Sequence, residues 1–144
     1  ALGALGKQIM FDAFRFKCPP QELNAAIIKQ LRGLLDLGIG EIKARAEKQE
    51  ALLEYPIFFN DWQDNKKIIR NLLDRISADQ LPLEIYRYTT FEDGSVLEEQ
   101  LTLKEANEAL TALQRIELEQ DMLSQLEAGH ISSRDEYVPD DEDV

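Results

Sequence analysis

Apolar and polar residues alternate near the start of the chain, over residues 8–16, with Ile9 and Phe11 two positions apart. Alternation of this kind is typical of a strand that has one buried face. Pro19 and Pro20 follow, and proline cannot donate a hydrogen bond to a neighbouring strand, so we expect the strand to end there. Because proline is well tolerated in the first turn of a helix, the pattern predicts a helix that begins at the two prolines.

The spacing of apolar residues after the prolines changes from two to three or four, as one face of a helix requires. Gly38 and Gly40 interrupt this spacing, and glycine readily adopts the left-handed conformation that ends a helix. We therefore expect a helix–turn–helix corner, with the second helix over residues 41–50. Residues 52–59 are rich in β-forming side chains, but Pro56 restricts them to an edge strand or an extended connection.

The chain then shows a third helical pattern followed by a second alternating stretch. Asn60 or Asp61 is expected to cap the helix, whose apolar residues recur with a helical period. Residues 81–90 alternate as a strand does, and the Asp-Gly pair at residues 93–94 predicts a tight turn. A hairpin into a further strand over residues 95–101 follows from this pattern.

The last apolar pattern begins at Thr102 and Glu105, which have the spacing of a capping box. A long helix is predicted from there to Gly129. Its apolar stripe is longer than one small sheet can cover, which makes a homodimer through this C-terminal helix one interpretation. After Gly129 the chain turns polar, and residues 140–143 are all acidic, so we expect a disordered acidic tail.

These patterns predict an α+β fold in which a small sheet has helices packed on one face, with an added hairpin strand and a long C-terminal helix. A chain of 144 residues is long enough for one domain without disulfides or a metal. We expect a flexible N-terminus over residues 1–7, a single domain over residues 8–129 and the disordered tail over residues 130–144.

The charge of the chain narrows the classes of partner. Asp and Glu outnumber Lys and Arg by 28 to 16, for a net charge of -12, which repels phosphate backbones and anionic lipid. We therefore expect no direct nucleic-acid binding, and the charge serves either solubility or a basic partner. Cys18 is the one cysteine, and no apolar run reaches 18 residues, so we expect a cytoplasmic protein that does not enter a membrane.

Catalytic signals are weak throughout the sequence. His130 is the only histidine and has no second ligand nearby in sequence for a zinc site, and no nucleophile or phosphate-loop motif occurs. An enzyme would have to use Asp61, Asp64, Tyr86 and Tyr88 in a shared cleft. We therefore predict a protein that is not an enzyme and that uses neither a metal nor a cofactor.

Residues 26–43 read Ala-Ile-Ile-Lys-Gln-Leu-Arg-Gly-Leu-Leu-Asp-Leu-Gly-Ile-Gly-Glu-Ile-Lys. The segments Ile-Lys-x-Leu-Arg and Gly-Ile-Gly-Glu-Ile-Lys resemble the C-terminal domain of the bacterial ribosomal stalk protein. The predicted order of elements agrees with that family over roughly residues 8–87. The resemblance implies a compact split βαβ-like core with helices on one face of the sheet.

In the stalk family, the first two helices and the turn between them recruit translation GTPases. The resemblance therefore implies a non-enzymatic protein-binding module, associated with translation or the ribosome. Asn24 and Gly40 depart from the family, which usually has lysines at these positions. The partner-binding residues that the resemblance implies are Lys29, Arg32, Gly38, Ile39, Glu41 and Lys43.

Two other functions stay open on the sequence alone. An acidic inhibitor or immunity-type protein would cover a basic enzyme with its negative charge, with Asp141 and Glu142 as candidate contacts. A protease adaptor of the ClpS kind is the other, because Ile-Phe-Phe-Asn-Asp at residues 57–61 resembles the strand of that family that ends in Asn-Asp. Phe58, Phe59 and Trp62 are secondary candidates for partner binding, but large aromatic side chains next to a helix start are mostly buried, so we expect them to pack in the core.

Overall fold

A computed structural model describes residues 8–59 and 61–138 of the chain. In this part of the molecule four antiparallel strands form one sheet, in the order β2-β1-β3-β4. The strands are β1 (Ile9–Lys17), β2 (Leu53–Pro56), β3 (Glu84–Phe91) and β4 (Val96–Leu101). The longest strand, β1, therefore lies inside the sheet, and the short strand β2 forms one edge.

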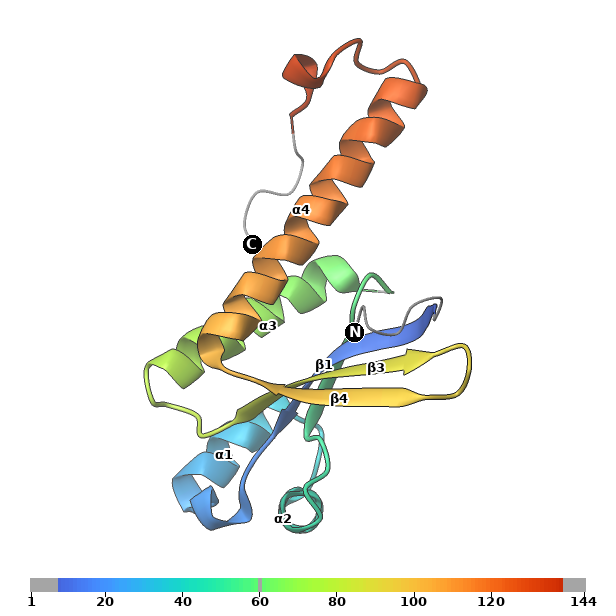
Figure 1. Cartoon of the computed structure of the whole chain (residues 1–144). Helices are drawn as coiled ribbons and strands as arrows, with labels where there is room; N and C mark the ends of the chain where they lie inside the picture. The colour runs from blue at the N-terminus through green and yellow to red at the C-terminus, as the bar shows by residue number, and fades with distance from the viewer. Residues whose placement is uncertain (1–7, 60, 139–144) are drawn as a thin grey trace.

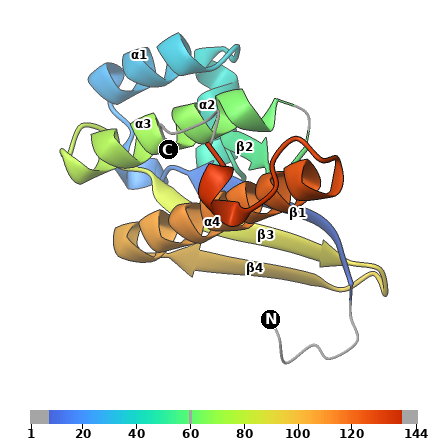
Figure 2. The ribbon, with the colours of Figure 1, turned by 90° about the horizontal axis from the view of Figure 1, so that it is seen from above.

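The helices cover one face of this sheet, as Figure 2 shows. They are α1 (Ala25–Leu34), α2 (Ile39–Glu47), α3 (Trp62–Ser77) and α4 (Leu103–Glu127), with short 3-10 helices η1 (Pro20–Glu22) and η2 (Arg134–Glu136). The second half of α4 extends beyond the sheet (Figure 1). The predicted α+β fold, with helices on one face, an added hairpin strand and a long C-terminal helix, is confirmed.

Alternation along β1 divides its side chains between the core and the open face of the sheet. Phe14 and Phe16 are fully buried against the helices. Arg15, between them, lies over the ring of Tyr88 with its Cζ 3.5 Å from the ring centroid and pairs with Glu54 at 2.7 Å. The open face is thus built from ion pairs and stacked rings and needs no second layer.

The core draws on the sheet and on all four α-helices. Ile28 and Leu31 of α1, Ile42 of α2 and Leu110 of α4 are buried, because their spacing of three or four residues places them on the faces turned to the sheet. Burial of a leucine or isoleucine side chain contributes about 1.5–3 kcal/mol to stability. The apolar period read from the sequence therefore predicts which face of these helices is buried.

A buried ion pair connects α3 to α4. Lys66 has no exposed surface, and its Nζ donates to Glu117 Oε1 at 2.9 Å. Glu117 also accepts a hydrogen bond from Gln63. A buried ammonium is tolerated only when a charged partner replaces the lost water, so this pair fixes how α4 lies on α3.

Two predicted turn and cap signals are confirmed. Gly94 has a φ of +87° in the hairpin between β3 and β4, a conformation that residues with a Cβ rarely adopt. Thr102 accepts from the Glu105 backbone N–H at 3.1 Å, and the Glu105 carboxylate accepts from the Thr102 N–H at 2.8 Å. The capping box therefore places the start of α4 where the sequence predicted it.

The helix predicted to begin at the two prolines is wrong in its start. Pro20 opens only the 3-10 turn η1, and α1 begins five residues later at Ala25. Asn24 caps α1, since its side chain accepts from the Ile27 backbone N–H at 2.9 Å. The hydrogen bond from the Ile27 N–H to the Asn24 side chain therefore sets the start of α1, although proline is also tolerated in a first helical turn.

The predicted left-handed glycine corner is also wrong. Gly38 has a φ of -78° and is the N-cap of α2, while Gly40 lies inside that helix. The second helix therefore covers Ile39–Glu47 instead of residues 41–50. An extended connection at residues 35–38, and not a left-handed glycine, separates the two helices.

The segment expected to be a disordered tail is described as far as residue 138. Within it, Arg134 donates to Glu119 at 3.0 Å and the Tyr137 hydroxyl donates to Asp121 at 2.6 Å, so η2 lies along the end of α4. Residues 139–144, and with them the acidic run, fall outside the described residues. The same holds for the N-terminus expected to be flexible, residues 1–7, and for Asn60.

Candidate functional site

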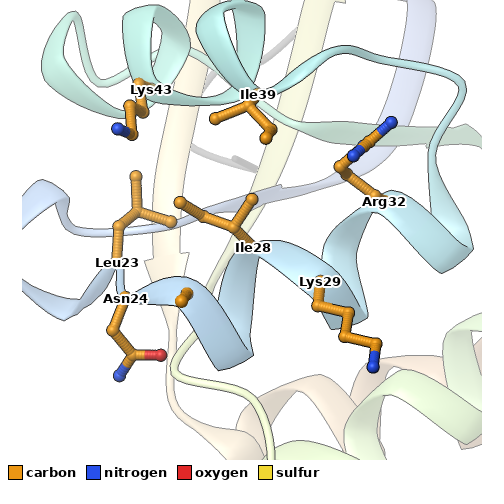
Figure 3. Close-up of a pocket in the computed structure, with 8 residues that line it drawn as sticks. Leu23, Asn24, Ile28, Lys29, Arg32, Ile39 and Lys43 are labelled. Atoms are coloured by element: carbon orange, nitrogen blue, oxygen red, sulfur yellow. The ribbon is translucent and has the colours of Figure 1, made fainter.

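A groove lies between α1 and α2, and the residues just before α1 complete it. Its volume is about 430 Å³. Leu23 and Lys43 lie at one end and Arg32 at the other, with Ile28 and Ile39 between them (Figure 3). The residues that line the groove are Leu23, Asn24, Ala25, Ile28, Lys29, Arg32, Ile39 and Lys43. Four of the six residues implied by the stalk resemblance thus line one cavity.

Lys29, Arg32 and Lys43 give this groove a positive charge. All three are exposed, and none forms an ion pair with another described residue. No acidic residue is among the residues that line the groove. In a chain with a net charge of -12, three unpaired cations around one cavity form a local field of opposite sign.

The floor of the groove is apolar. Ile28 is buried at the base, while Ile39 leaves 44% of its surface exposed. Each Å² of this apolar surface that a partner removes from water contributes about 25 cal/mol to the free energy of binding. The groove therefore offers an apolar floor and a positively charged rim. Together they favour a partner that presents an apolar side chain with carboxylates on either side of it.

Glu41 and Gly38 lie next to the groove but do not line it. The Glu41 carboxylate accepts from Arg45 Nε at 3.2 Å, an ion pair within α2. Gly38 caps α2 through an extended backbone, and the space where a Cβ would stand is open. Glu41 therefore neutralises Arg45, and Gly38 sets where α2 starts.

Sequence reasoning missed four residues of the groove as contacts: Leu23, Asn24, Ala25 and Ile28. Ala25 lies four residues before Lys29, and Ile28 lies four before Arg32, which places these residues on one side of α1, whereas Leu23 and Asn24 precede the helix. That spacing was the available signal. Leu23 and Ile28 also match the core period, so the sequence could not separate groove from core at these positions.

The secondary aromatic candidates divide into one buried and two exposed side chains. Trp62 is buried, as expected, with its ring edge-to-face against Phe58 at 5.6 Å. Phe58 and Phe59 are exposed, so the expectation that they pack in the core is wrong for both. Phe58 and Asp61 have positive φ values, and Asp61, at the N-cap position of α3, makes no side-chain cap hydrogen bond. Asp141 and Glu142 lie outside the described residues.

The residues considered for catalysis do not share a cleft. Tyr86 and Tyr88 lie on the open face of the sheet with Lys17 and Arg15, whereas Asp61 and Asp64 lie at the start of α3 on the opposite side. His130 is exposed just after α4. Among the described residues, no three His, Cys, Asp or Glu side chains come close enough together to hold a metal ion.

Burial raises the pKa of the Cys18 thiol to about 11, and the carboxylates of Glu22 and Glu84 act in the same direction. A thiol in this state is protonated near neutral pH and is a poor nucleophile. None of the helices in residues 8–59 and 61–138 has the length and apolar character needed to cross a membrane.

Comparison with known proteins gives no relative for this chain. No family model matches it, and no curated protein or solved structure is significantly similar to it. The groove between α1 and α2 is therefore the feature of this molecule that bears on its function.

Proposed function

We propose that this protein is a non-enzymatic binding module that holds a protein partner in the groove between α1 and α2. The observation that carries the proposal is a set of three cations, Lys29, Arg32 and Lys43, around an apolar floor in an otherwise acidic chain. None of the three forms an ion pair within the part of the chain that the structure describes. Exposed cations that the fold does not pair are free to meet charges on a partner. Cations of this kind speed association and select acidic partners.

The partner that fits the resemblance is a component of the translation machinery. In the stalk family the two corresponding helices recruit translation GTPases, and Lys29, Arg32 and Ile39 stand at matching positions. The order of elements from β1 to β3 is also the order that the resemblance implied. These points support a ribosome-associated role in a reducing cytoplasm. The identity of the partner in this proposal comes from the resemblance to the stalk family.

An acidic inhibitor of a basic enzyme is the alternative that the overall charge supports. It places the contact on negative surface, away from the α1–α2 groove. The two proposals therefore differ in which charge reversals abolish binding. They differ also in whether the bound partner is acidic or basic at its contact surface.

Affinity capture from a bacterial lysate separates the two. The bait is the full chain, beside a Lys29→Glu/Arg32→Glu variant and a Lys67→Glu/Lys104→Glu control with the same change in charge at exposed sites on α3 and α4. We expect translation GTPases or ribosomes with the wild type and the control, but not with the groove variant. Equal capture by all three baits would remove the groove as the site, and capture of one basic protein only at low salt would favour the inhibitor.

A further inference from the structure

A second surface, independent of the α1–α2 groove, lies where β1 extends past its edge neighbour. Among the described residues, β2 pairs with β1 only over residues 13–16. One more hydrogen bond, from Ile57 N to Asp12 O at 2.9 Å, ends the contact. Ile9 and Phe11 of β1 therefore pair with β3 on one side, with a β-bulge at Met10 between them, and no strand of the described part of the chain lies beside residues 9–11 on the other side.

A cavity of about 550 Å³ lies along this free segment, which we call the β1 notch. Pro56 to Phe59 form its far wall, and α4 contributes Leu113 and Ile116. Five exposed apolar side chains line it: Ile9, Met10, Phe58, Phe59 and Ile116. Exposed apolar side chains gathered around a cavity mark an interaction surface far more often than single ones do.

The charged groups of the notch are already neutralised. Arg87 donates to both carboxylate oxygens of Asp12, at 2.6 Å and 3.1 Å, and Thr89 donates to the same carboxylate at 3.1 Å. A charged occupant would have to break this arrangement, at the cost of leaving one ion unpaired. The notch therefore favours an uncharged occupant, in contrast to the cation-lined groove.

The outer edge of β4 shows how this chain protects an edge that is not used. Glu98 and Glu99 carry charge along that strand, and charge on an edge strand discourages pairing with another chain. Residues 9–11 have no charged side chain, so the β1 notch lacks this protection. An edge of this kind offers backbone donors and acceptors together with apolar contacts.

We infer that the β1 notch binds an extended, uncharged apolar segment of a partner protein, which adds a strand beside residues 9–11. Main-chain hydrogen bonds to β1 would hold the segment, and alternate side chains would contact Ile116 and Phe59. A second copy of this chain does not fit the same role. Because β2 occupies the adjoining position on that edge, the free segment is recessed by about 4.8 Å, and two recessed segments cannot reach each other.

The test uses an acetylated, amidated hexapeptide of alternating valine and threonine as probe. A matched peptide with N-methyl groups on its two central residues keeps the side chains but cannot complete a strand pair. Trp62 reports binding, because its ring contacts Phe58 at the wall of the notch and the chain has no other tryptophan. Hydrogen exchange of the Met10 amide locates the contact.

Two variants on α4 make the test specific. Ile116 lines the notch, whereas Leu123, exposed to a similar extent two turns later, does not. We expect saturable binding by wild type and Leu123→Asp, and a Kd raised at least about tenfold in Ile116→Asp, because the new carboxylate would be buried against apolar side chains. Phe59→Ser should weaken binding in the same direction, and all variants should match the wild type in urea midpoint.

Three results would overturn the inference. The first is no saturable response to the peptide below about 1 mM. The second is equal affinity for the N-methylated peptide, which would show contact without strand addition. The third is protection of the Met10 amide that grows with protein concentration in the absence of peptide, which would make a second copy the occupant. None of these results bears on the α1–α2 groove.

Discussion

Replacement of Glu117 by glutamine tests whether the buried pair with Lys66 holds α4 on α3. The substitution keeps the size and the hydrogen-bonding reach of the side chain but removes its charge. Lys66 has a side-chain exposure of 1% and Glu117 one of 21%. The ammonium would then stay buried without the charge of Glu117.

The expected loss follows from this geometry. At an effective dielectric constant near 20, unit charges 2.9 Å apart attract by about 6 kcal/mol, an upper limit because glutamine still accepts a hydrogen bond. Removing one partner of a fully buried pair costs about 3–5 kcal/mol. Lys66 makes a further interaction, and water reaches Glu117, so we expect a loss of about 2–3 kcal/mol in the free energy of unfolding.

Urea unfolding followed by Trp62 fluorescence and far-UV circular dichroism measures this loss. The matched control is Glu119→Gln, because Glu119 pairs with Arg134 at 3.0 Å with both side chains well exposed. Exposed pairs contribute about 0–1 kcal/mol, so the control should change little. If Glu117→Gln cost no more than Glu119→Gln, the ion pair would not be what holds the helices together. A Lys66→Met/Glu117→Leu variant should recover most of the loss, since it leaves no buried charge.

Three further predictions concern local features of the fold. Thr102→Ala should lower the free energy of unfolding by about 1 kcal/mol in urea titrations, because it removes the cap of α4. Gly94→Ala should lower the free energy of unfolding by about 1–2 kcal/mol because of its positive φ. Gly33→Ala, inside α1 with open space around it, should raise the free energy of unfolding by about 0.5–1 kcal/mol. Equal effects at the two glycines would contradict the turn assignment. The raised pKa of Cys18, about 11 against an ordinary 9, means that its contribution to stability is present below pH 9 and is lost as the pH rises through 11. Urea unfolding at pH 8 and pH 10.5 should therefore show a steeper loss for wild type than for Cys18→Ser, by about 2 kcal/mol.

The elements that the sequence predicted well are those set by local chemistry. The capping box at Thr102 and Glu105 and the Asp-Gly turn each need only a few neighbouring residues, so they could be located to within a residue. Pro56 limited residues 52–59 to an edge strand or an extended connection, and Leu53–Pro56 forms the edge strand β2. Alternation and helical period then placed the strands and helices between these points.

The errors arose where two local preferences competed. Pro20 and Asn24 are both acceptable near a helix start, and the side-chain cap at Asn24 decided the outcome. Glycine permits a left-handed conformation, and the sequence therefore predicts one at Gly38. In the structure Gly38 is extended and is the N-cap of α2. Residue type alone predicts that Phe58 and Phe59 pack in the core, but both side chains are exposed in the turn between β2 and α3.

The candidate site was predictable only in part. Lys29, Arg32, Ile39 and Lys43 were named from a resemblance in sequence, and the packing of α1 against α2 brings them to one cavity. The volume of that cavity and the absence of any acidic residue from its lining depend on how two helices cross, which no local pattern encodes. The β1 notch was not predicted, because it depends on the unequal lengths of two strands far apart in sequence.

Site-specific photo-crosslinking tests the central claim most directly. A benzoylphenylalanine placed at Ile39, in the groove, is compared with one at Val96, which is similarly exposed on the far edge strand β4. In an extract that contains the captured partner, the account predicts a crosslink from residue 39 to an acidic surface of that partner, lost when Lys29 and Arg32 are changed to glutamate. A crosslink from residue 96 alone, or one from residue 39 that survives both charge reversals, would contradict it.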